Sequence, residues 1–263
     1  MRTLLRGGLV YDPTAAALRQ VDLLVEGHMI TQVAPALSVT ADQVIDASGK
    51  LVLPGLMNAH THSDQNFMRA VLGPLPLELW LVEALEYAPP EPERLQLSAL
   101  LGAIELLKCG VTTVVDNLKL PSGKELAALD AVASAYRQVG IRAYLAPLVG
   151  DLPHHQALPI GREQYAPADL ALLEQRSALP TAQALEVAEE AIQHYHQRGG
   201  RLQCWVGPTG HQRCSDQLLT GCAALAERYQ VGIHTHALET KAQAVLDQRR
   251  YRQPALRRLH QLG

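Results

Sequence analysis

The chain has 263 residues, of which 48% are hydrophobic and 19% charged, with a formal net charge of −3. This composition is that of a globular protein with a sizeable core, and without a basic block it indicates no nucleic-acid partner. No apolar run reaches the ~20 residues of a membrane span, and no signal peptide is recognisable. We therefore expect no membrane association. The four cysteines form no CxxC pair, and without an export signal we expect reduced thiols and a cytoplasmic location.

The first 50 residues predict a small antiparallel β segment. Stretches rich in β-forming residues lie at 3–10, 21–26, 29–33 and 44–46. A sheet this small is not stable alone, so it should pack against another part of the protein. We therefore divide the chain into an N-terminal β segment, 1–50, and a second domain, 51–263.

From residue 51 onward, apolar strands alternate with amphipathic helices. Helices are expected at 93–109, from a capping box at Ser122–Glu125 to a stop at Gly140, at 181–198, and after a cap at Ser215. Residues 151–180 predict a long loop with a short helix. The expected strands are 51–59, 111–117, 142–149, 202–209 and 231–237. About five βα units of this kind predict an α/β fold with a parallel sheet or a (β/α) barrel.

Two histidines stand at the end of the first of these strands. His60 and His62 are two residues apart, so on a strand they project to the same side. Active sites of (β/α) barrels lie at this end of the strands, and two imidazoles on one face form half of a zinc or iron site. A bare pair with this spacing is more often two exposed loop histidines, but its position after an apolar strand favours the metal site.

A similar pair follows the strand expected at 231–237. Only one of His234 and His236 needs to bind a metal, and the other could be an interior histidine with a satisfied hydrogen bond. Glu239 follows three residues after His236. It could be an acidic residue favoured by the dipole of the next helix, worth roughly 0.3–1 kcal/mol, or a general acid/base beside a metal-activated water.

These motifs, taken in order, resemble the amidohydrolase superfamily. Residues 45–62 are similar to its opening signature, 110–116 to its second strand, 207–215 to its fourth strand and following loop, and 236–240 to its fifth-strand motif. The resemblance is to the branch that contains the cytosine, guanine and S-adenosylhomocysteine deaminases and the triazine hydrolases. It implies that His60, His62 and His236 bind a divalent metal, zinc first and iron as the alternative, and that Glu239 shuttles protons.

The resemblance also bears on the number of metals and on the substrate. Members with two metals use a fourth-strand lysine, but this chain has no lysine between Lys124 and Lys241, which implies one metal. Trp80 resembles part of a substrate loop, with an ordinary packed aromatic as an equal alternative. Thr209 stands where several nucleoside deaminases have a substrate-contacting histidine. His211, two residues later, is a further candidate for substrate binding.

The resemblance therefore implies a hydrolase of non-peptide carbon–nitrogen bonds, and in particular the deamination of a nucleobase- or nucleoside-like heterocycle. The full family pattern has eight βα units, with a histidine on the sixth strand and an aspartate on the eighth, and no counterpart of either is recognisable here. We therefore expect a truncated barrel that is inactive alone. The alternative functions are a non-catalytic remnant, one part of a split enzyme, or another barrel hydrolase with different metal ligands. The partner of such a chain would be a complementing C-terminal fragment or a second copy in a homo-oligomer.

Overall fold

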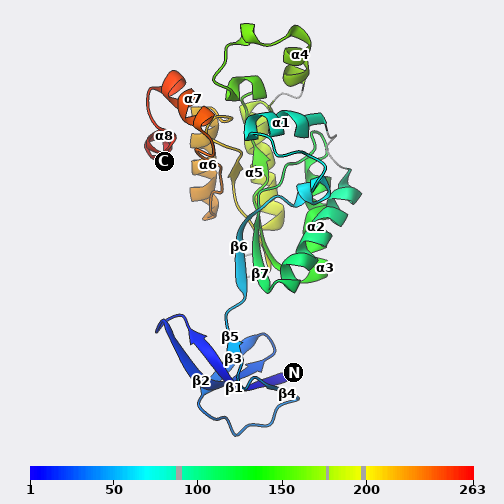
Figure 1. The fold of residues 1–263 in the computed structure, drawn as a ribbon, viewed down its shortest axis with the longest axis vertical. Helices are drawn as coiled ribbons and strands as arrows, with labels where there is room; N and C mark the ends of the chain where they lie inside the picture. The colour runs from blue at the N-terminus through cyan, green and yellow to red at the C-terminus, as the bar shows by residue number, and fades with distance from the viewer. Residues whose placement is uncertain (87–90, 176–177, 197–199) are drawn as a thin grey trace. The chain divides into compact units, whose positions relative to one another are not determined.

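The computed structural model describes residues 1–86, 91–175, 178–196 and 200–263, and it has an α/β fold (Figure 1). The chain divides into two compact units, Met1–Leu56 and Met57–Gly263. Among the described residues, no helix has the length and apolar character that crossing a membrane requires. Each unit has its own buried residues and is described separately.

The N-terminal unit is a five-stranded sheet. Strands β1, β2 and β3 are antiparallel neighbours, whereas β4 and β5 both pair with β1 in parallel. The prediction of a purely antiparallel segment is therefore wrong. The chain between β3 and β4 returns across the sheet instead of forming a tight hairpin, which makes β4 parallel to β1. The strands are β1 Arg2–Asp12, β2 Ala17–Glu26, β3 Met29–Ala34, β4 Gln43–Asp46 and β5 Leu51–Val52.

A buried carboxylate joins two parts of this sheet. Asp22 on β2 is 4% exposed and accepts hydrogen bonds from the backbone N–H of Gly7, at 2.7 Å, and of Leu37, at 2.9 Å. Gly7 lies at an irregularity in the pairing of β1 with β2 and has a φ of 71°, a conformation that favours glycine. Asp22 thus holds this irregularity and the connection after β3 together.

The second unit contains a sheet in the order β10-β8-β7-β6, in which β8 pairs in parallel with both β7 and β10. A second, two-stranded parallel pair joins β9 and β11. No closed barrel is present in the part of the chain that the structure describes. The strands are β6 Leu56–Thr61, β7 Val111–Asp116, β8 Arg142–Leu145, β9 Leu148–Val149, β10 Leu202–Cys204 and β11 Gly207–Pro208.

The helices of this unit confirm most of the predicted ones. Ser215 caps α6 by accepting a hydrogen bond from Leu218 N at 3.1 Å, as expected. The predicted capping box at Ser122 is wrong, because the N-cap of α3 is Lys124 and makes no side-chain cap. The end of the helix predicted to residue 198 lies outside the described residues. The helices are α1 Leu77–Glu86, α2 Pro92–Lys108, α3 Glu125–Val139, α4 Pro167–Gln175, α5 Thr181–Tyr195, α6 Asp216–Tyr229, α7 Lys241–Tyr251 and α8 Ala255–Leu262.

The core of the second unit lies between the sheet and the helices α2, α3, α5 and α6. The apolar strands and the apolar faces of the amphipathic helices pack against each other, so their large side chains form one buried layer. Successive parallel strands then end at one edge of the sheet, where the polar residues described below lie. Fully buried examples are Leu95, Leu129, Tyr136, Leu145, Leu202 and Leu218.

Three of the predicted strands are shorter than expected, and one is absent. The stretch 142–149 divides at Ala146–Pro147, where proline has no N–H for a ladder. The stretch 202–209 divides at Trp205–Val206, whose backbone N–H groups donate to Leu145 O and Gly232 O. The stretch 51–59 divides at Pro54. The predicted strand 231–237 is a single parallel bridge between Val206 and Ile233, and the backbone turns away at Leu238, which has a φ of 56°.

Candidate metal centre

The three predicted metal ligands lie close together. His60 and His62 project from β6, and His236 comes from the segment that bridges to Val206. One ring nitrogen from each of the three lies within 4.8 Å of the others. The rings of His62 and His236 are nearly parallel, with centroids 5.2 Å apart, and the ring of His60 stands edge-on to both. The folded chain therefore brings His236 next to His62, which lies 174 positions earlier in the sequence.

Main-chain carbonyls fix the tautomers of two of these rings. His62 Nδ1 lies 2.5 Å from Asn117 O, and His236 Nδ1 lies 2.6 Å from Thr209 O. A carbonyl oxygen can only accept, so each Nδ1 carries the proton and donates it. In the neutral ring, Nε2 then carries a lone pair. The two Nε2 atoms face each other at 3.3 Å.

This arrangement fits a divalent metal. Two lone pairs at this separation repel each other unless a cation lies beside both. Two nitrogens bound to a tetrahedral zinc at 2.0–2.1 Å are about 3.4 Å apart. Burial, with the nearby histidines adding to it, lowers the pKa of His60; burial also lowers the pKa of His62, although the Asn117 carbonyl opposes it. Both rings are therefore neutral near pH 7, which is the form that binds metal.

The carbonyl that orients His62 is held by a buried polar network at the end of β7. Asp116 is fully buried and accepts from Ser63 N at 3.0 Å and from the hydroxyl of Tyr136 at 2.8 Å. Asn117 donates from its backbone to Thr61 O at 2.9 Å and from its side chain to Ala146 O at 2.8 Å. The prediction from sequence missed this network, although a polar residue that ends an apolar strand is a usable signal.

Burial also acts on the carboxylates of this network. It raises the pKa of Asp116, and burial together with the charge of Asp116 raises the pKa of Asp64 to about 7. Two carboxyl groups taken out of water near each other resist ionising together. The region behind His62 is therefore less negative than its sequence suggests.

Glu239 lies just before α7 and not in its first turn. The N-cap of this helix is Thr240, whose side chain accepts from Gln243 N. The exposed carboxylate of Glu239 is near Gln243, whose Nε2 donates to Glu239 Oε2 at 3.3 Å. Its negative charge acts on His60, where it opposes the dominant effect of burial and raises the pKa of the imidazole. Glu239 is thus in the electrostatic neighbourhood of the histidine cluster.

The two predicted substrate residues differ in their placement. Trp80 is half-buried on α1, a helix whose Glu78 accepts a hydrogen bond from the hydroxyl of Thr240, next to Glu239. His211 has a fully buried side chain, with Nε2 3.1 Å from Asp247 Oδ2. The buried ring of His211 packs against Asp247, and its contact with a substrate stays a prediction.

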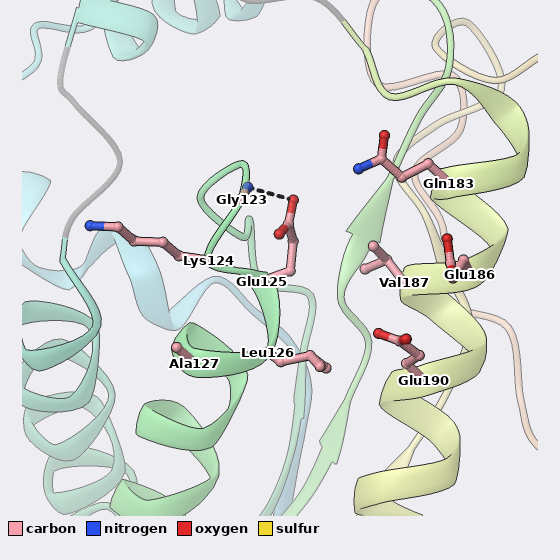
Figure 2. A pocket seen from close by; sticks show the side chains of 9 residues that line it. All are labelled: Gly123, Lys124, Glu125, Leu126, Ala127, Gln183, Glu186, Val187 and Glu190. Carbon is pink, nitrogen blue, oxygen red and sulfur yellow. Dashed lines mark hydrogen bonds between the residues drawn. The ribbon is translucent and has the colours of Figure 1, made fainter.

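A cavity of about 330 Å³ lies elsewhere, between the start of α3 and one side of α5. Figure 2 shows its lining, with Glu186 and Glu190 on α5, and Glu125 accepting a hydrogen bond from Gly123 N at 3.0 Å. No histidine lines it, and carboxylates of this kind are common on exposed helices. It is separate from the histidine cluster.

The comparisons with known proteins place the chain in a family. A family model described as the amidohydrolase family matches residues 51–249, and the chain belongs to this family. It is 28% identical over 257 residues to a 5'-deoxyadenosine deaminase of Methanosarcina acetivorans, an alignment that covers 97% of this chain and 52% of that protein. The chain thus spans about half the length of the curated relatives it matches.

Solved structures share the fold of the whole chain. A triazine hydrolase from Arthobacter aurescens aligns with a TM-score of 0.85 and 25% identity, covering 100% of this chain and 58% of that one. An adenosine deaminase from Xanthomonas campestris with bound zinc aligns with a TM-score of 0.80 and 24% identity, covering 99% and 55%. These neighbours have the metal-dependent, barrel-type fold of the family.

Proposed function

We propose that this chain carries the metal-binding part of an amidohydrolase that removes an amino group by hydrolysis from an adenosine-like heterocycle. The observation that carries the proposal is the pair of Nε2 atoms of His62 and His236, 3.3 Å apart, with both Nδ1 protons donated to carbonyls. Membership of the family and the deaminase names of the relatives support the reaction and the substrate class.

His60, His62 and His236 would hold one divalent ion, and zinc is favoured by the imidazole donors and by the zinc-bound neighbour. When bound, the ion supplies Lewis-acid activation of the attacking water. The carbonyls of Asn117 and Thr209 hold two of the rings in the tautomer that this role requires.

Glu239 would move the protons. Its carboxylate takes a proton from the attacking water and returns it to the heterocycle as a carbon–oxygen bond forms. The bond from carbon to the amino group then breaks, and ammonia leaves with the second proton. Gln243 limits the orientations of the carboxylate through its hydrogen bond at 3.3 Å. Trp80, half-buried on the neighbouring α1, is the candidate for contact with the substrate ring.

The test uses the tagged protein purified under native conditions from cells that encode it, so that any associated polypeptide is retained. We expect the zinc-loaded preparation to release ammonia from 5'-deoxyadenosine or adenosine. Glu239→Gln should keep its zinc and lose at least ~100-fold in rate. A zinc-loaded preparation that releases no ammonia from either compound would contradict the proposed reaction. A Glu239→Gln variant with unchanged rate would remove Glu239 from it. The same assay on the separately produced 263-residue chain tests whether a second polypeptide is required.

A further inference from the structure

The three clustered histidines have three different partners at Nδ1 of the ring. His62 and His236 each face a main-chain carbonyl. His60 faces a side chain: its Nδ1 lies 2.7 Å from Nε2 of His234. The two rings are tilted by 31°, with centroids 5.0 Å apart, which is a hydrogen-bonded contact and not a stack.

The direction of this hydrogen bond decides whether His60 can bind a metal through Nε2. If His60 Nδ1–H donates, the neutral ring of His60 has a lone pair at Nε2. If His234 Nε2–H donates instead, the neutral ring of His60 carries its proton at Nε2 and has no lone pair there. His234 must therefore be the acceptor, with its own proton on Nδ1.

We propose that His234 is a positioning residue that orients His60 and fixes its tautomer, in the role that main-chain carbonyls have for His62 and His236. This inference rests on the proposed metal site and extends it by a residue outside the ligand set. His234 is held in place by its own backbone, which donates to Val206 O at 2.9 Å next to the Val206–Ile233 bridge. Outer partners of this kind typically contribute 10- to 100-fold to metal affinity.

The segment that carries His234 also carries His236. His234 lies on the same stretch and two residues earlier, so one piece of backbone supplies both a metal ligand and the partner of another ligand. A change in the position of this segment would therefore alter two of the three ligands together. The partners of His62 and His236 are main-chain carbonyls, whereas the partner of His60 is a side chain. Of these three contacts, a side-chain substitution of the partner can therefore remove the one made by His234.

The experiment measures zinc affinity by competition with a fluorescent chelator for the wild type, His234→Ala and His234→Gln. We expect His234→Ala to weaken zinc binding by 10- to 100-fold, and His234→Gln to restore most of the affinity because its amide oxygen can accept from His60. His260→Ala, an exposed histidine on α8, is the matched control and should bind as the wild type does. Circular dichroism of each variant checks the fold.

Three results would overturn the inference. Unchanged affinity in His234→Ala would show that the contact does not matter. Equal losses in the alanine and glutamine variants would exclude the acceptor role. X-ray absorption spectra with one fewer imidazole around zinc in His234→Ala than in the wild type would make His234 a ligand and not a partner. Failure of the proposed metal site has a different signature, because the wild type itself would then bind no zinc. Failure of the proposed reaction is different again, because a zinc-loaded wild type would then release no ammonia.

Discussion

Arg258 on α8 provides the sharpest test of how the loop that follows β11 is held. Its guanidinium is 3% exposed and donates to His211 O at 2.8 Å, to Cys214 O at 3.1 Å and to Asp216 Oδ1 at 2.7 Å. It also stacks on the ring of Tyr251, with its central carbon 3.7 Å from the ring centroid. The loop that carries these carbonyls also carries Thr209, whose carbonyl orients His236.

The expected cost of Arg258→Met follows from these contacts. The methionine fills part of the volume but leaves two buried carbonyls without donors, at about 1–3 kcal/mol each. The ion pair adds little, because the carboxylate of Asp216 is 60% exposed. We therefore expect a loss of about 2–6 kcal/mol in the free energy of unfolding. With a slope of about 3 kcal/mol/M, this lowers the urea midpoint by about 0.7–2 M.

Urea titrations followed by circular dichroism make the measurement. Arg257→Met, which removes an exposed neighbour on the same helix, is the control and should shift the free energy of unfolding by less than about 0.5 kcal/mol. Equal small effects of the two variants would refute the reasoning, because they would mean that the buried carbonyls find other donors. A change in slope instead of midpoint would indicate a different denatured state.

Three further predictions concern stability. Burial and the charge of Arg213 lower the pKa of His154 to about 2, below its unfolded value near 6.5. The unfolded chain therefore gains a proton first as the pH falls, and the free energy of unfolding drops by about 2 kcal/mol between pH 7 and 5. His154→Gln, which keeps an acceptor for Arg213, should remove this share of the pH dependence, and an unchanged pH profile would contradict the assignment. Gly207→Ala places a Cβ 2.5 Å from Pro147 O and 2.7 Å from Ala146 O, so it should cost about 1–3 kcal/mol. Gly73→Ala, which meets nothing within 4 Å, serves as its control in thermal unfolding, and equal midpoints would refute the steric argument. Tyr136→Phe removes the hydroxyl that donates to Asp116 Oδ2 at 2.8 Å and should cost about 1–3 kcal/mol; a neutral effect in urea unfolding would mean that Oδ2 finds a replacement donor in the variant.

Local patterns in the sequence were enough to predict most elements and the pair of His60 and His62, whereas the choice of His236 over His234 came from the resemblance to the amidohydrolase superfamily. The i, i+2 spacing of His60 and His62 after an apolar strand reports side-chain direction directly, and the helices α2, α3 and α6 follow from apolar periodicity. Helix ends were less accurate, since Lys124 and not Ser122 stands at the N-cap of α3. Cap identity depends on tertiary contacts as well as on residue type.

Contacts between distant segments could not be predicted from local patterns. The burial of His211 depends on Asp247, which lies on a different helix. The contact between His60 and His234 joins residues 174 positions apart. The parallel pairing of β4 with β1 depends on the path of the intervening loop and not on strand propensity. Each of these features is set by which elements meet in space, and periodicity within one segment carries no information on it.

The central claim is that His60, His62 and His236 hold one divalent metal ion. The most direct test is the zinc content of the purified protein and of the three single alanine variants, measured by elemental analysis after dialysis against zinc. His28→Ala, an exposed histidine of the N-terminal unit, is the control. The account predicts one zinc per chain in the wild type and the control, and a large loss in each of the three variants. Stoichiometric zinc retained in all three variants would contradict it.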